Sequence, residues 1–169
     1  MTPLRKNGQP TVATRDAWLA ALAAEQRARF GYGVLGPQLA APALGLARAA
    51  QSAHEELIAT TSAAMSAAGV APNPPAADYP DLYPVSSAAA AKALAIRLED
   101  AAARAWRFAY ATAAGNSSAG QPLAGAPANP VERSVLTLAQ RALIDSAVRE
   151  TQWRLQLGTG TPTVPFPGI

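Results

Sequence analysis

The sequence contains no cysteine, a single histidine and few charged residues, which make up 15% of its 169 positions. Without cysteine the chain has no disulfide, iron–sulfur cluster, thiolate zinc site or cysteine nucleophile. One histidine and no Gly-x-Ser-x-Gly turn give no sign of a serine hydrolase triad. The length is typical of one domain, and the composition excludes a highly charged disordered chain, a disulfide scaffold and collagen.

Long apolar runs are also missing. No uninterrupted run approaches the roughly 20 residues that a membrane span needs. The first residues, MTPLRKNGQPTV, lack the apolar core of a signal peptide. We therefore expect a cytoplasmic protein that does not associate with membranes. The net charge is only +3, and Arg alternates with acidic residues along most of the chain. That pattern is typical of solvated helix faces, so we expect no nucleic-acid partner.

Alanine fills about a quarter of the chain, and four alanine-rich segments favour helix. Proline- and glycine-rich stretches separate them, and no segment alternates as a strand would. The sequence therefore predicts an all-α fold. The expected helices run from about Thr14 to Leu35, from Leu39 or Pro42 to Ala68 with Gly69 as the C-cap, from Ser86 and Ser87 to Gly115 and Asn116, and from Asn129 and Pro130 to Gly158.

The break over residues 69–85 has five prolines and is too long for a simple hairpin. Extended, it covers roughly 50 Å, whereas a helix of 26 residues is about 39 Å long. It can therefore run the whole length of a bundle, and one such crossover is the ferritin-like arrangement of four helices. We predict residues 1–13 as a flexible N-terminus, 14–157 as a ferritin-like four-helix bundle with a long crossover between helices two and three, and 158–169 as an extended proline-rich tail.

Ionisable residues interrupt the apolar face of each expected helix. On a helical wheel Glu25 in helix one, His54 in helix two and Glu99 in helix three all point toward the core near mid-helix. Glu150 in helix four lies roughly 7 Å lower along the bundle. These four residues, with Tyr32 on the same face as Glu25, form a candidate polar cluster in the core.

One interpretation of this cluster is a metal site. Ferritin-like carboxylate proteins use one Glu from each of two helices and a Glu-x-x-His from each of the others. Here Gln51 stands three positions before His54, and helix four has no histidine. The ligand set is half missing, so we predict no cofactor. Iron or manganese, if bound, would be held by Glu25, His54 and Glu99.

The other interpretation, which we favour, is a hydrogen-bonded polar cluster. A buried glutamate must be paired or protonated. His54 is a natural partner for Glu25, and so is an arginine at a helix edge, Arg29 in helix one or Arg149 in helix four.

Several segments resemble a known family, in order along the chain. AAEQRARFGYG, YPVSSAAAAKALAIRLEDAAARAWR, AVRETQW and the FPG of the tail are similar to the DUF4439 family, an actinobacterial ferritin-like domain of unknown function. The resemblance implies a ferritin-like four-helix bundle and no particular activity. Glu25 matches the glutamate of the first motif and Glu99 that of Leu-Glu-Asp. Gln26 stands where that motif usually has histidine, which argues further against metal chemistry.

We therefore expect a non-catalytic binding or structural protein that has lost the di-metal site, with no catalytic residue and an unidentified protein or small-molecule partner. Few large side chains are available for the core and Phe108 lies close to a charged face, so we expect a homodimer. One alternative is a reduced di-iron or di-manganese oxidoreductase using Glu25, His54 and Glu99. Another is a carrier of apolar small molecules between the alanine-rich helices. The aromatics between prolines, Tyr79, Tyr83 and Phe166, are predicted to clasp the bundle.

Overall fold

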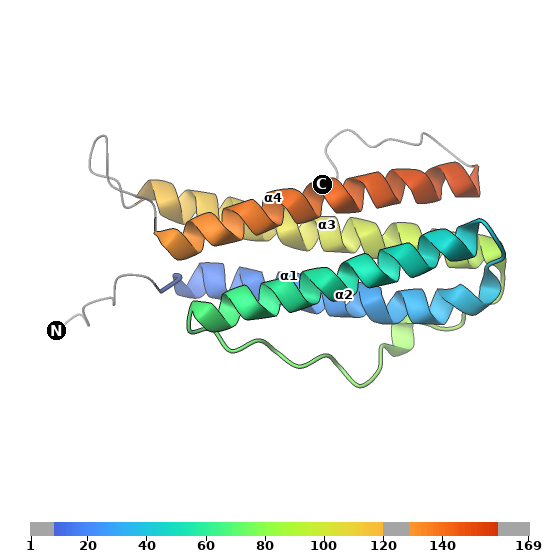
Figure 1. Cartoon of the computed structure of the whole chain (residues 1–169), viewed down its shortest axis with the longest axis horizontal. Helices are drawn as coiled ribbons and strands as arrows, with labels where there is room; N and C mark the ends of the chain where they lie inside the picture. The colour runs from blue at the N-terminus through green and yellow to red at the C-terminus, as the bar shows by residue number, and fades with distance from the viewer. Residues whose placement is uncertain (1–8, 120–128, 159–169) are drawn as a thin grey trace.

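The computed structural model describes residues 9–119 and 129–158, and this part of the chain contains helices and no strand. Figure 1 shows α1 running in one direction, α2 and α3 in the other, and α4 parallel to α1. The predicted all-α four-helix bundle is confirmed. The helices are α1 Val12–Leu35, α2 Ala43–Ala67, α3 Ala88–Ala119 and α4 Pro130–Leu157, with short 3₁₀ turns at Gly36–Gln38 and Pro80–Leu82.

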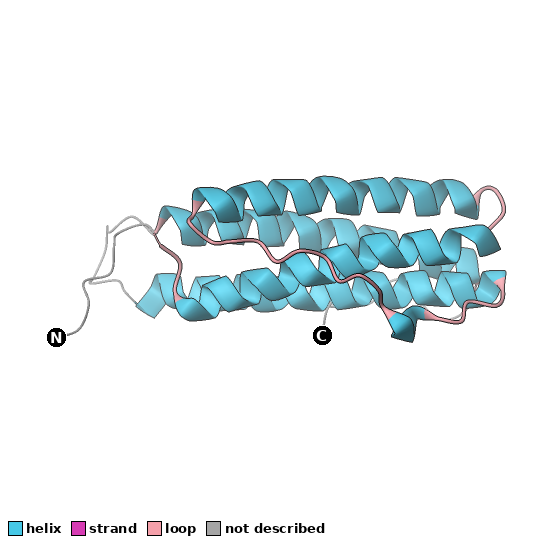
Figure 2. Ribbon diagram, turned by 90° about the horizontal axis from the view of Figure 1, so that it is seen from below, coloured by secondary structure: helices cyan, strands magenta, loops and turns pink. Residues whose placement is uncertain are grey.

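A long crossover joins the parallel helices α2 and α3. Residues 68–87 leave one end of the bundle and reach the other, passing through the 3₁₀ turn at Pro80–Leu82 (Figure 2). A parallel pair of helices requires such a connection, because the chain must return to the end where it started. The expectation of a long crossover is therefore confirmed.

Side chains of α1 hold this crossover. Gln26 donates from Nε2 to the backbone oxygen of Asn73 at 2.9 Å. Arg27 forms an ion pair with Asp81.

The ring of Phe30 packs against the rings of Tyr79 and Tyr83, with centroids 5.1 and 6.4 Å apart. Two of the three predicted clasp aromatics therefore pack on α1. Phe166 lies outside the described residues.

Several helix ends differ from the prediction, and α2 begins at Ala43, after the predicted Leu39 or Pro42. α1 begins at Val12, because Thr11 and not Thr14 is the N-cap: the Thr11 side chain accepts from the Thr14 amide. α2 ends one residue early, so Ala68 is the C-cap and Gly69 follows it with φ of 72°. α3 continues through Gly115 to Ala119. Glycine only lowers helix propensity, so it need not stop a packed helix.

The predicted ends of α4 are confirmed. The Asn129 side chain caps the helix by accepting from the Val131 amide, and Pro130 takes the first helical position. Gly158 ends the helix in the left-handed conformation, which glycine adopts without steric cost. Residues 1–8 of the predicted flexible start and residues 159–169 of the predicted extended tail lie outside the described part and stay predictions. Val12 and Ala13, at the end of the predicted flexible start, belong to α1.

Two apolar clusters fill the described core, one toward each end of the bundle. The cluster near the α1–α2 turn is built around Leu35, Leu94 and Trp153. The cluster at the other end is built around Trp18, Leu22 and Trp106. Much of the rest of both clusters is alanine, which lets the helices approach closely.

The side chain of Leu98 in α3 packs tightly against α1 at Gly31. A Cβ at this position would lie 2.5 Å from Cδ1 of the buried Leu98, whereas the nearest atom to a Cβ at Gly33 is 4.0 Å away. We expect Gly31→Ala to destabilise the bundle by about 1–3 kcal/mol, because Leu98 must move within a packed core. Gly33→Ala, the matched control, should be neutral or up to about 1 kcal/mol stabilising through helix propensity. Urea unfolding measures both, and equal effects would contradict this account.

Candidate functional site

A layer of charged and polar side chains crosses the middle of the bundle, between the two apolar clusters. α1 contributes Glu25 and Tyr32, α2 contributes His54, α3 contributes Glu99, and α4 contributes Arg149. Glu25, His54 and Glu99 are 0% exposed, and the Arg149 side chain is 13% exposed. We call these five residues the buried charged layer. The structure thus brings together four of the five predicted cluster residues.

His54 lies at the centre of this layer, between two carboxylates. Its Nδ1 is 2.5 Å from Glu25 Oε2, and its Nε2 is 3.2 Å from Glu99 Oε1. Both ring nitrogens donate to these carboxylates when His54 is an imidazolium, because an ionised carboxylate can only accept. The ring also stacks on Tyr32, with centroids 5.4 Å apart and planes 28° from parallel.

Glu99 accepts most of the hydrogen bonds in the layer. Its Oε1 accepts from the Tyr32 hydroxyl at 2.6 Å and from Arg149 Nε at 2.9 Å, in addition to His54. Arg149 also donates from Nη2 to Ser146 at 3.2 Å, one turn earlier on α4. Of the two arginines considered as partners, Arg149 is the one that reaches the layer.

Two tryptophans, which the sequence did not reveal as donors, extend the network. Trp106 Nε1 donates to Glu25 Oε1 at 2.7 Å, and Trp153 Nε1 donates to the Tyr32 hydroxyl at 2.8 Å. A buried indole N–H usually has a hydrogen-bond partner. Trp106 also lies two turns after Glu99 on α3, so this spacing was the signal that could have placed it beside the acids.

The electrostatics of the layer keep His54 protonated and Glu99 ionised. Burial lowers the pKa of His54, but hydrogen bonds to Glu25 and Glu99 and their charges outweigh it and raise that pKa to about 9. Burial raises the pKa of Glu99, but His54 and Arg149 outweigh it and hold that pKa below its usual value. Burial and the Glu99 charge raise the pKa of the Tyr32 phenol well above 10, so Tyr32 stays a donor. Two carboxylates face two cations, and the layer is neutral.

One predicted member of the cluster, Glu150, and one candidate partner, Arg29, lie elsewhere. Glu150 is 3% exposed, but its Oε1 accepts from Arg154, Nη2 at 2.6 Å and Nε at 2.9 Å, so its carboxylate is paired along α4. Arg29 does not pair with Glu25. It forms an ion pair with Glu55 at 2.9 Å, where both side chains are about half exposed.

A further buried acid, which the wheel did not single out, lies at one end of the bundle. Glu132 Oε1 accepts from the Thr14 hydroxyl at 3.2 Å and ties the first turn of α4 to α1.

The donor set does not fit a di-metal centre. Both nitrogens of His54 are directed at carboxylates, and the guanidinium of Arg149 lies against Glu99 on the α4 side. Glu99 Oε2 has no hydrogen-bond partner within the described chain, but one oxygen is far short of a coordination shell. Among the described residues, no group of three or more His, Cys, Asp and Glu side chains is placed to hold a metal ion.

Solvent reaches the edge of the layer from one side. α2 and α4 make few contacts with each other, and a groove of about 440 Å³ runs between them. Arg149 lines this groove together with apolar side chains such as Leu57 and charged ones such as Glu56 and Asp145. The guanidinium therefore separates the buried carboxylate of Glu99 from water.

Fold and site define a class of protein: a four-helix bundle with one long crossover and a neutral charged layer in its core. The chain belongs to the family described as a domain of unknown function, DUF4439, whose match covers residues 17–126. It is similar to the crystal structure of the conserved hypothetical protein rv2844 from Mycobacterium tuberculosis, with 28% sequence identity and a TM-score of 0.70. That similarity covers 88% of this chain and 99% of the other. A search of curated proteins found no match.

No helix in the described ranges is both long enough and apolar enough to cross a membrane.

Proposed function

We propose that this protein is a non-catalytic binding protein built on a ferritin-like bundle, in which two protein cations take the place of a metal centre. The observation that carries the proposal is the bridging of Glu25 and Glu99 by the one imidazole of His54. A carboxylate pair on two facing helices is what a metal-binding bundle also has. Here its charge is balanced by His54 and Arg149.

The positions of the usual ligand motifs support this assignment. Where ferritin-like metal proteins place Glu-x-x-His on two helices, the corresponding spacing on α2 is Gln51-x-x-His54. On α4 the same spacing at the level of the layer is Ser146-x-x-Arg149, whose side chains are hydrogen-bonded. A guanidinium stays protonated in proteins and therefore cannot bind a cation.

Metal binding tests the proposal directly. We expect the purified protein, incubated with Fe(II) or Mn(II) and then desalted, to retain well under one equivalent by ICP-MS. Glu25→Ala and Glu99→Ala should not change that value. Near-stoichiometric metal in the wild type that both variants lose would overturn the proposal. The reduced di-metal oxidoreductase would then be the correct reading.

We also propose a homodimer. Three apolar side chains of α4, Ile144, Val148 and Leu155, are 57%, 52% and 64% exposed. Their spacing of four and seven residues places them on one face, opposite the core side of the helix. On α3 Phe108 is 61% exposed, as its position near the charged face suggested. Sedimentation equilibrium decides this point, and a monomer at all concentrations would contradict it.

A cytoplasmic location and an actinobacterial origin remain part of the proposal. The mycobacterial source of the similar structure supports the origin.

A further inference from the structure

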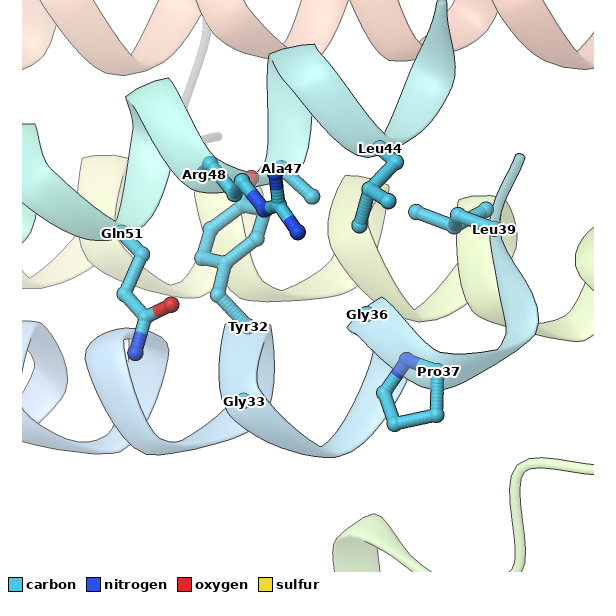
Figure 3. A pocket seen from close by; sticks show the side chains of 9 residues that line it. All are labelled: Tyr32, Gly33, Gly36, Pro37, Leu39, Leu44, Ala47, Arg48 and Gln51. Carbon is cyan, nitrogen blue, oxygen red and sulfur yellow. The ribbon is translucent and has the colours of Figure 1, made fainter. Parts of the chain in front are cut away.

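We infer that the pocket between the end of α1 and the start of α2 binds a small monocarboxylate with an apolar body. This inference rests on the proposed binding function and supplies its class of ligand. The pocket holds about 380 Å³ and lies beside the buried charged layer, with Tyr32 belonging to both (Figure 3). Its size is within the range of small-molecule sites.

Most residues that line the pocket are apolar or glycine, and the ring of Tyr32 is fixed by hydrogen bonds. Leu39, Leu44 and Ala47 line it together with the side chain of Tyr32, and the backbone comes close to it at Gly33 of α1 and Gly36 of the 3₁₀ turn. The Tyr32 hydroxyl is held between Glu99 and Trp153, at 2.6 and 2.8 Å. A wall that is already rigid costs little further ordering when a ligand binds.

Two polar side chains without partners reach into this apolar pocket. In Figure 3 Arg48 and Gln51 extend from α2 toward α1, with Tyr32 between the two helices. Within the described chain neither the Arg48 guanidinium nor the Gln51 amide has a hydrogen-bond or ion-pair partner. The nearby arginine of α1, Arg29, is by contrast paired with Glu55.

The charge of the pocket selects an anion. Arg48 is the only charged residue that lines it, and the adjacent buried charged layer is neutral. A guanidinium matches a carboxylate in geometry, with two parallel N–H donors for two oxygens. A single cation balances a monoanion, whereas a phosphate monoester would keep one charge unpaired. The Gln51 amide can donate to the same group or to a neighbouring carbonyl.

Phenylacetate is a suitable probe, since it joins one carboxylate to one apolar ring. Titrated into ¹⁵N-labelled protein, it should shift the backbone amides of Gly33, Gly36, Ala47 and Gln51 in a saturable manner. We expect a dissociation constant of about 1 mM or below. Phenylacetamide, the neutral isostere, should bind at least about tenfold more weakly, because a hydrogen bond to a charged group contributes about 1.5–3 kcal/mol.

Arg48→Gln should weaken phenylacetate binding by at least about tenfold, and Arg48→Lys by less. Arg97→Gln is the matched control. Like Arg48, Arg97 is exposed, but it lies on α3 and does not line the pocket. It should leave the dissociation constant unchanged. Because Arg48 is exposed, the variants should keep the wild-type spectrum, which verifies their fold in the same experiment.

Three results would overturn the inference: no saturable shift at the pocket, equal binding of phenylacetamide, or tighter binding of phenyl phosphate than of phenylacetate. None of these changes the metal retention measured for the proposed function. Failure here with no metal bound removes only this ligand class. Stoichiometric metal at Glu25 and Glu99 removes the proposed function even if phenylacetate binds.

Discussion

Glu99→Gln should destabilise the protein by about 3–5 kcal/mol, the cost typical of removing one partner from a buried charge pair. Glu99 accepts from Tyr32, His54 and Arg149 through one oxygen and is 0% exposed. The amide keeps the shape of the side chain but leaves two cations facing only one carboxylate. Urea unfolding at pH 6 measures the loss.

The matched control is Glu55→Gln. Glu55 also pairs with an arginine, Arg29 at 2.9 Å, but both side chains are about half exposed. Exposed ion pairs contribute about 0–1 kcal/mol, so this variant should stay close to wild type. A Glu99→Gln effect no larger than that of Glu55→Gln would contradict the charge balance assigned to the layer.

A double variant sharpens the test. Glu99→Gln combined with Arg149→Leu removes one charge of each sign and leaves His54 paired with Glu25. The double variant should lose less free energy of unfolding than the two single variants lose together, with a coupling of about 1–3 kcal/mol. Strict additivity would show that Arg149 and Glu99 act independently despite their 2.9 Å contact.

Raising the pH should destabilise the protein through His54. Its pKa is about 9 in the folded protein and about 6.5 in an unfolded chain. The stabilisation from its proton is therefore complete below pH 6.5 and is lost as the pH rises through about 9. The difference corresponds to roughly 3 kcal/mol in the free energy of unfolding.

This pH dependence can be assigned with little ambiguity, because His54 is the only histidine and the chain has no cysteine. The groups that face His54 are Glu25, Glu99 and Tyr32, with Arg149 bonded to the same oxygen of Glu99. Urea unfolding between pH 6 and 9.5 should show the decline, and His54→Gln should abolish it.

The carbon-bound imidazole protons give an independent readout of His54 by NMR. A titration midpoint near 6.5 would contradict the account in which Glu25 and Glu99 stabilise the protonated imidazole of His54. On the acid side the sign reverses for Glu99: its lowered pKa stabilises the fold above about 4.5, and that contribution is lost as the pH falls through the folded value.

The fold was largely predictable from local features of the sequence. Alanine-rich segments between prolines and glycines gave four helices, and Asn129, Pro130 and Gly158 marked the ends of the last one. The length of the break after Gly69 indicated a crossover, because chain reach depends only on residue number. The start of α1 was predicted wrongly partly because of a tertiary contact. Thr14 is buried inside the helix, and its hydroxyl donates to Glu132 in α4 instead of capping α1.

Helical periodicity alone placed Glu25, His54, Glu99 and Tyr32 toward a common core, since it fixes the direction in which a side chain points. It left open which of them would meet, because the relative height and rotation of two helices depend on their packing. Arg149 and not Arg29 reaches the carboxylates, and Glu150 pairs with Arg154 instead. The bridging position of His54, the indole donors and the pocket beside Tyr32 follow from the packing of side chains from separate helices, which no single segment of sequence contains.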